Sequence, residues 1–273
     1  MRRIEECEKL SKQIRKDVHK MTYDKKAGFI GSAFSCADIL GVLYGTIIKF
    51  DINNPDALEN DTVILSKGHA ASAWYATLAN IGVFRRERLF NEFNTSGFKM
   101  GVHPKRNALP GIIISSGSLG QGCGQACGVA LANKIQNNNS RVYVILGDGE
   151  CNEGSNWEAF MLASRHKLDN LTVIIDRNRL QSYAHDNQVL NMDDMEDKLK
   201  SFGFKTFSVD GHSYKELIEA FDQAKNIEGK PTAIIANTIK GKGFKGFEDK
   251  VIWHYKWPED EDYKAALREL DKQ

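Results

Sequence analysis

The chain has 273 residues, enough for one large α/β domain or two small ones. Its 37 basic and 36 acidic residues nearly cancel, so the charge balance favours neither nucleic acid nor an anionic membrane as a partner. No apolar run approaches the roughly 20 residues of a membrane-spanning helix, and the charged N-terminus lacks the apolar stretch of a secretory signal. The five cysteines have no paired spacing, so we expect free thiols in a reducing cytoplasm. Without a repeat or a low-complexity linker, we expect residues 1–273 to form one domain.

The first third of the chain predicts two helices before a first strand. Residues 3–20 carry apolar side chains at amphipathic spacing, whereas residues 36–49 are apolar nearly all round. These patterns indicate a surface helix and then a buried one, with a turn over residues 27–32 between them. Residues 62–66 predict a short strand, and residues 71–84 predict a second buried helix directly after it.

A glycine-rich segment occupies the middle of the chain. The runs Gly101–Pro104 and Leu109–Gly111 lead into an expected strand at residues 112–114. The loop Ser115–Gly122 then opens a helix of small residues that runs to Ile135. Glycine lets the backbone approach a phosphate closely, but it equally permits close packing of a helix on a sheet. Taken alone, this loop favours neither interpretation.

The next stretch predicts a strand, a crossover helix and a second strand. Residues 142–146 and 171–175 are short, apolar and rich in β-branched side chains, which is typical of buried strands. Between them, apolar residues recur at helical spacing from about residue 154 to residue 166. Such a unit places its two strands parallel in one sheet with a right-handed connection.

Polar residues follow both of these strands directly. Asp148 comes after the first strand and Asn178 after the second, so the two side chains arrive together at the carboxyl edge of the sheet. One carboxylate and one amide oxygen form part of an all-oxygen shell, which suits Mg²⁺. Gly147 and Gly149 would let the backbone approach a diphosphate, and the following helix start adds amide donors. The sequence therefore predicts a metal and diphosphate site at this edge.

The rest of the chain continues the alternation of strands and helices. We expect a helix at 193–202, a strand at 205–209, a helix ending at Lys225 and a strand at 231–237. This alternation predicts an α/β fold: an open, mostly parallel sheet with helices on both faces. The segment Ile239–Gly243 follows the last strand at the same carboxyl edge, ahead of Trp253 and His254.

Several of these runs resemble known families. GDG with an asparagine thirty residues after its aspartate resembles the shared signature of thiamine-diphosphate enzymes. The runs ILSKGHAASAWYATLA, GVHP, LPG, SGSLGQG and TIKGKG…WH resemble transketolases in sequence and in order. The resemblance extends from about residue 5 to residue 270, but it covers only half of the family's chain. The chain therefore looks like the N-terminal subunit of a split transketolase, with the thiamine-diphosphate-binding fold.

The resemblance implies a set of site residues. The metal would be Mg²⁺, for which Ca²⁺ or Mn²⁺ can substitute, and its protein ligands would be Asp148, Asn178 and the Leu180 carbonyl. The cofactor would be thiamine diphosphate, bound by His69, Gly117, Leu119, Gly147, Gly149, Glu153, Asn178 and His254. The catalytic histidines would be His69, His103 and His254, with His103 near the reacting carbon. A carboxylate that only begins a helix explains Glu153 nearly as well.

The activity implied by the resemblance is the transfer of a two-carbon ketol unit from a ketose phosphate to an aldose. In the family, a glutamate on a second domain hydrogen-bonds the aminopyrimidine ring of the cofactor across a subunit interface. No carboxylate of this chain fits that role, so we expect a separate C-terminal subunit to supply it. We further expect two copies of each chain in the assembly.

Two other functions stay open at this point. The diphosphate-binding subunit of a 2-oxoacid dehydrogenase would share the metal motif, although the SKGHA, GSLGQG and KGKG…WH runs argue against it. A non-catalytic homologue would be favoured by broken metal ligands, and here these ligands are intact.

The chain departs from the family's pattern in two places beside the site. Phe29 stands where transketolases usually carry a histidine, and Leu180–Ala184 replaces the usual Leu-Gln-Ile-Asp-Gly. An apolar ring cannot hydrogen-bond a sugar hydroxyl. We therefore expect a substrate that is deoxygenated, branched or otherwise less polar near its reacting end.

Overall fold

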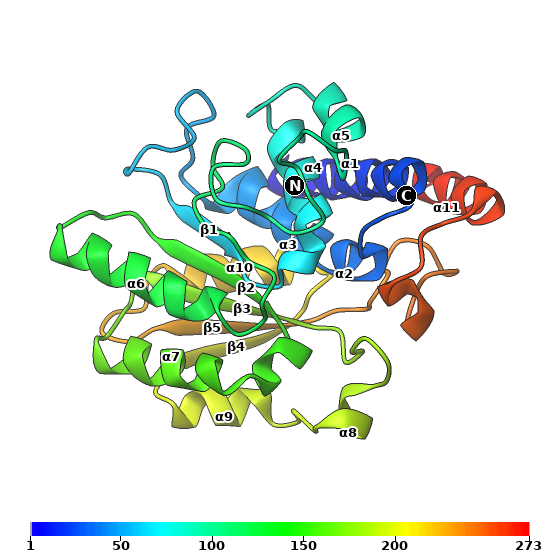
Figure 1. Ribbon diagram of the computed structural model, residues 1–273. Coiled ribbons are helices and arrows are strands. Elements are labelled where there is room, and N and C mark those ends of the chain that lie inside the picture. The colour runs from blue at the N-terminus through cyan, green and yellow to red at the C-terminus, as the bar shows by residue number, and fades with distance from the viewer. Residues whose placement is uncertain (1, 273) are drawn as a thin grey trace.

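The computed structural model describes residues 2–272, and five parallel strands form its central sheet (Figure 1). The strands lie in the order β1-β2-β3-β5-β4, and every neighbouring pair is parallel. Their bounds are β1 (Thr62–Leu65), β2 (Val142–Gly147), β3 (Leu171–Arg177), β4 (Lys205–Asp210) and β5 (Thr232–Asn237). This confirms the expected α/β architecture, because parallel strands need crossover helices to connect them.

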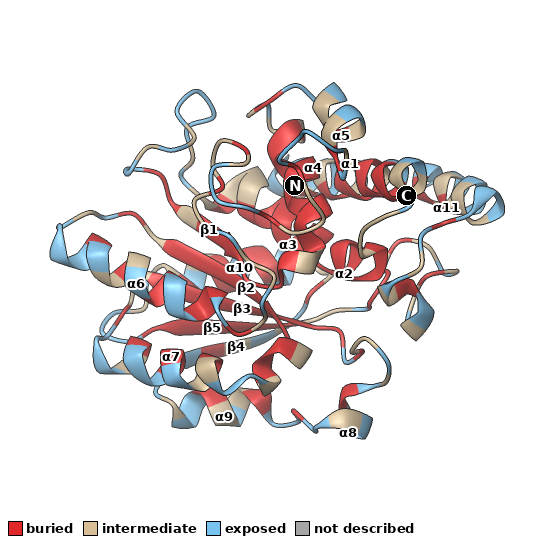
Figure 2. Ribbon diagram, in the orientation of Figure 1, coloured by how far each residue is buried: buried red, intermediate tan, exposed pale blue. Residues whose placement is uncertain are grey.

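Helices cover both faces of this sheet and bury a separate apolar core on each. One core packs under α1 (Arg2–Lys25), α3 (Ala37–Val42), α4 (Ala71–Asn80), α10 (Tyr214–Ala224) and α11 (Asp260–Lys272). The other packs under α6 (Gly122–Ile135), α7 (Gly154–Arg165) and α9 (Met195–Ser201). Ile174 belongs to the first core and Ile175 to the second, since successive strand residues face opposite sides of a sheet. Figure 2 shows the central strands buried and the outer helix faces exposed.

The segment after α1 differs from the sequence-based expectation. The expected turn at residues 27–32 gives way to a short helix, α2 (Ile30–Ser35), and the expected helix at 36–49 is interrupted. Its first part is α3, and a π-helical turn (Leu43–Ile47) follows before Ile48 becomes extended. The helix cannot continue there because the Lys49 amide donates to the Asp61 carboxylate at 2.8 Å.

The strand expected at residues 112–114 was wrong. The sheet ends at β1 on that side, and residues 112–114 form no strand. Their loop instead closes on itself, with Asn107 N donating to Ile112 O at 2.9 Å and Ser116 N donating to Pro104 O at 3.2 Å. Three successive isoleucines predict a strand, but Ile112 is the only one of them that is buried.

Several short elements complete the description. They are α5 (Glu87–Glu92), α8 (Asp186–Val189) and the 3₁₀ turns Gly68–Ala70, Gly149–Asn152 and Val251–His254. All five cysteines are buried and free, as expected. Across the described part of the chain, no helix combines the length and apolarity that crossing a bilayer requires.

Candidate active site

The carboxyl ends of β1, β2, β3 and β5 surround a cavity of about 300 Å³. Its lining includes nearly every residue that the sequence predicts for the site: His69, His103, Gly117, Leu119, Gly147, Asp148, Gly149, Asn178, Leu180 and His254. Phe29 lines it as well. Glu153 is the exception among the predicted residues. It is exposed, at the start of α7 and outside this lining, so its role toward a cofactor stays a prediction.

Asp148 is a buried carboxylate whose negative charge has no direct cationic partner. It is 3 % exposed, and among residues 2–272 it forms no ion pair. Burial, and then the nearby Asp176 carboxylate, raise the pKa of Asp148 to about 6. Its oxygens accept hydrogen bonds from the backbone amides of Gly149 and Arg179, which fix the orientation of the carboxylate. A cation in this position would remove the energetic cost of the buried charge.

The groups around Asp148 fit a hard divalent cation and a diphosphate. Asn178 and Leu180 are both buried in the same lining, so an amide oxygen and a carbonyl oxygen accompany the carboxylate. Within residues 2–272 no group of three or more His, Cys, Asp or Glu side chains could hold a metal ion, so a cation here would depend on one carboxylate and neutral oxygens. The buried Nε2 of Gln181 has no hydrogen-bond partner, and its side chain lies against Gly149 in the cavity wall. This donor is available to an anionic ligand beside the carboxylate.

Three imidazoles surround Phe29 on the wall of the cavity. The ring centroid of Phe29 lies 5.6 Å from His69, 5.6 Å from His103 and 5.5 Å from His254. Burial lowers the pKa of His103, and burial together with Lys67 lowers that of His69 well below its ordinary value. Burial and Lys240 lower the pKa of His254 to about 3. All three rings are therefore neutral near pH 7, each with one donor and one acceptor nitrogen.

Lys240 determines which nitrogen of His254 carries the proton. Its ammonium contacts Leu180 O at 2.8 Å, Gln181 O at 3.1 Å and His254 Nδ1 at 2.8 Å. Three contacts account for all three ammonium hydrogens, so Nδ1 of His254 accepts and Nε2 carries the proton. Burial lowers the pKa of Lys240 to about 8, which still leaves most of it charged at pH 7.

Glycines let the loops of the site approach one another. Gly117 has φ 140°, and a Cβ there would lie 2.8 Å from Cδ2 of His103. A Cβ on Gly68 would lie 2.6 Å from the Gly117 amide nitrogen. The turn that carries His69 therefore packs directly on the glycine-rich loop, which resolves the ambiguity of that loop: it packs closely and also lines the cavity.

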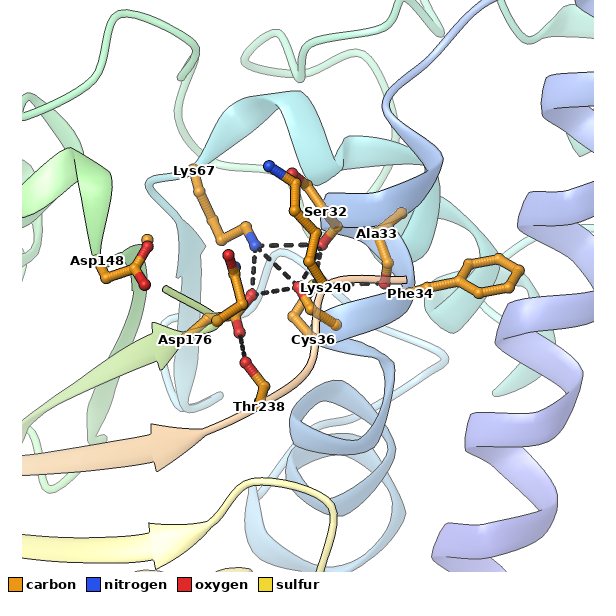
Figure 3. Close-up of polar contacts among 12 residues, drawn as sticks. Ser32, Ala33, Phe34, Cys36, Lys67, Asp148, Asp176, Thr238 and Lys240 are labelled. Carbon is orange, nitrogen blue, oxygen red and sulfur yellow. Dashed lines mark hydrogen bonds and ion pairs between the residues drawn. The ribbon is translucent and has the colours of Figure 1, made fainter. Parts of the chain in front are cut away.

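Besides Lys240, sequence reasoning missed three buried charged residues in this region. Glu150 is 2 % exposed, and its carboxylate accepts from Ser66 Oγ, from Gly120 N at 3.0 Å and from Gly147 N at 3.1 Å. The other two, Lys67 and Asp176, form a buried ion pair, and Lys67 lines the cavity (Figure 3). Their closeness to His69 and Asn178 in the sequence was the available signal.

Comparisons with known proteins find relatives of this chain by sequence and by fold. Residues 8–268 match the family model described as "Transketolase, thiamine diphosphate binding domain". The 6-deoxy-6-sulfo-D-fructose transketolase subunit SqwG of Clostridium sp. (strain MSTE9) is 39% identical over 90% of this chain and 89% of its own. An apulose-4-phosphate transketolase subunit of Phocaeicola vulgatus is 35% identical, over 98% of this chain and 95% of its own.

Solved structures show the same likeness over part of their length. The transketolase of Campylobacter jejuni superposes with a TM-score of 0.89 at 31% identity, covering 99% of this chain and 43% of its own. The chain thus spans about two fifths of that transketolase. Because the matched segment and the fold both agree, the chain belongs to the transketolase family, as its thiamine-diphosphate-binding part.

Proposed function

We propose that this chain is the diphosphate- and metal-binding subunit of a two-chain, thiamine-diphosphate-dependent transketolase. The observation that carries the proposal is the uncompensated Asp148 carboxylate, which shares one cavity with Asn178, the Leu180 carbonyl and three neutral imidazoles. The names of the relatives of similar length, which are transketolase subunits, support it. A 2-oxoacid dehydrogenase subunit is not favoured by any of these relatives.

One set of cavity residues would bind the metal, and the histidines would bind the diphosphate and the substrate. Asp148, Asn178 and the Leu180 carbonyl would hold Mg²⁺, which offsets the charge of the diphosphate. His254, with its proton on Nε2, and His69 would donate to the diphosphate or to substrate, and His103 would bind hydroxyls or move a proton near the reacting carbon. The bound cofactor supplies the electron sink for breaking a carbon–carbon bond.

A partner chain would complete the site. We propose that it carries the glutamate for the aminopyrimidine end of the cofactor and that two copies of each chain assemble in the cytoplasm. The names of three relatives, each called a subunit, support a partner.

Phe29 bears on the choice of sugar. Its ring stands among His69, His103, His254 and Tyr255, so it interrupts a wall of hydrogen-bonding groups with an apolar surface. We propose a ketose phosphate donor that is deoxygenated, branched or less polar where it meets this ring. Two relatives are named for 6-deoxy-6-sulfo-D-fructose and for apulose 4-phosphate, which supports a substrate outside the common hydroxylated ketoses.

The test is reconstitution. The purified chain is mixed with its partner, thiamine diphosphate and Mg²⁺, and ketol transfer is assayed with a panel of ketose phosphates and an aldose acceptor. We expect transfer by the wild-type assembly and none with Asp148→Ala. Acylation of a lipoyl protein without ketol transfer would refute the proposal. An Asp148→Ala assembly that binds thiamine diphosphate with the same affinity and the same metal dependence as wild type would also refute it.

A further inference from the structure

The ammonium of Lys67 faces the carboxyl edge of the sheet, but its hydrogens are already used. It donates to the Asp176 carboxylate, to Ser32 O at 3.1 Å and, more weakly, to Ser35 Oγ at 3.5 Å. Lys67 is 1 % exposed and Asp176 is fully buried. The two side chains form a buried ion pair, and the three acceptors account for the three ammonium hydrogens of Lys67.

Asp176 connects several segments that form the site. Besides Lys67, its carboxylate accepts from Ser35 Oγ at 2.6 Å and from Thr238 Oγ1, and its carbonyl accepts from Asp148 N at 3.3 Å. These contacts join the end of β1, the end of β2, the end of β3, the segment after β5, and α2. Figure 3 shows Asp148 beside this cluster, without a contact to Lys67.

Each of the three residues before His69 makes a contact that fixes the position of its turn. Ser66 Oγ donates to Glu150, Lys67 pairs with Asp176, and Gly68 packs on the Ser116–Gly117 backbone. Lys67 also holds α2 through Ser32, three residues after Phe29. The position of the ion pair thus fixes two walls of the cavity at once.

We propose that Lys67 is a positioning residue rather than a ligand of the diphosphate: it neutralises Asp176 and fixes the His69 turn and α2 through it. This rests on the proposed function, because it concerns the same site. The rival role is a direct contact between the Lys67 ammonium and the diphosphate, which its lining position and its positive charge would suggest. The two roles predict opposite results when both charges are removed together.

Removing Lys67 alone leaves a buried, unpaired carboxylate close to Asp148 and to the anionic ligand, so it harms the site under either role. Removing both charges leaves no such carboxylate. If Lys67 acts through Asp176, the double variant Lys67→Met/Asp176→Asn recovers the affinity for thiamine diphosphate that Lys67→Met loses. If Lys67 binds the diphosphate directly, the double variant stays as weak as the single one. Asparagine at 176 keeps the volume and a donor and an acceptor for Ser35 and Thr238.

The experiment measures the Kd of thiamine diphosphate in the presence of Mg²⁺, by calorimetry on the full chain assembled with its partner. The variants are Lys67→Met, Asp176→Asn and the double variant, with Lys200→Met as a control at a side chain that is 52% exposed. We expect at least tenfold weaker binding in Lys67→Met, binding within about threefold of wild type in the double variant, and no change in the control. Thermal unfolding without cofactor provides a second readout, in which the double variant melts above Lys67→Met.

A double variant that folds but binds as weakly as Lys67→Met would overturn the proposal. If Lys67→Met does not fold, the comparison is between the double variant and wild type: near-equal affinity supports the positioning role, and a tenfold or greater loss overturns it. Absence of thiamine diphosphate binding by the wild-type assembly would instead refute the proposed function, so the two failures are distinguishable.

Discussion

Replacing Asp148 by asparagine is expected to remove the pH dependence that this carboxyl gives to folding and to abolish the response of the chain to metal and cofactor. Burial and Asp176 raise the pKa of Asp148 from its ordinary 3.8 to about 6 in the folded chain. Because the folded state holds the proton more tightly than the unfolded state, this carboxyl favours folding at low pH, and that contribution is lost as the pH rises through 6. The shift corresponds to a cost of about 3 kcal/mol above pH 7.

The asparagine variant has no buried charge, but its amide nitrogen must face the backbone N–H of Gly149 or of Arg179, which costs about 1–3 kcal/mol at every pH. We expect the difference in unfolding free energy between the variant and wild type to favour the variant by up to about 3 kcal/mol more at pH 8 than at pH 4. This change in the difference is expected to occur mainly as the pH rises from about 4 to 6. Urea unfolding of the ligand-free chain at several pH values measures this directly, with Asp197→Asn, a side chain 77% exposed, as the control.

Ligands are expected to stabilise wild type more than Asp148→Asn. Thiamine diphosphate with Mg²⁺, at a concentration about 100 times its Kd, would stabilise the wild-type assembly by about 2.7 kcal/mol. The variant, which lacks the charged metal ligand, would gain little. A difference in stability between Asp148→Asn and wild type that does not change with pH would refute the view that this carboxylate is uncompensated without metal.

Three other expectations follow from the same site. Phe29→His is expected to raise kcat/KM for xylulose 5-phosphate by about tenfold, because a ring nitrogen replaces an apolar edge. The control Phe29→Leu is expected to leave kcat/KM low. A wild-type kcat/KM that is already high and falls in Phe29→His would contradict this. In Glu150→Gln the side-chain NH2 group must face the backbone N–H of Gly120 or of Gly147, so two donors meet. We therefore expect the free energy of unfolding to fall by about 1–3 kcal/mol and cofactor binding to weaken. Unchanged stability and cofactor affinity would show that these contacts do not matter. The isolated chain is expected to show no ketol transfer until its partner is added, and full turnover before that addition would rule out a split enzyme.

The sequence by itself determined the alternation of strands and helices and the residues at the strand ends. Short β-branched runs and helical periodicity are local properties, so β2, α7 and β3 lie within one or two residues of their expected bounds. Parallel strands then oblige Asp148 and Asn178 to meet at one edge, whatever the rest of the chain does. The residues that we propose to hold the metal and the diphosphate could therefore be chosen without coordinates.

Local pattern failed where the outcome depends on distant contacts. Residues 112–114 have the composition of a strand, but the backbone of Ile112 bonds within its own loop, to Asn107 and Leu109, and not to the edge strand β1. Lys67 and Asp176 are 109 residues apart, and a charged residue in either position is ordinarily exposed. Only the tertiary structure buries them together, because an ion can leave water only where a partner of opposite charge and enough hydrogen bonds replace its hydration. Whether a buried lysine of the cavity can bind a ligand depends on whether a carboxylate already pairs with it. The sequence motif does not contain that information, and the tertiary structure does.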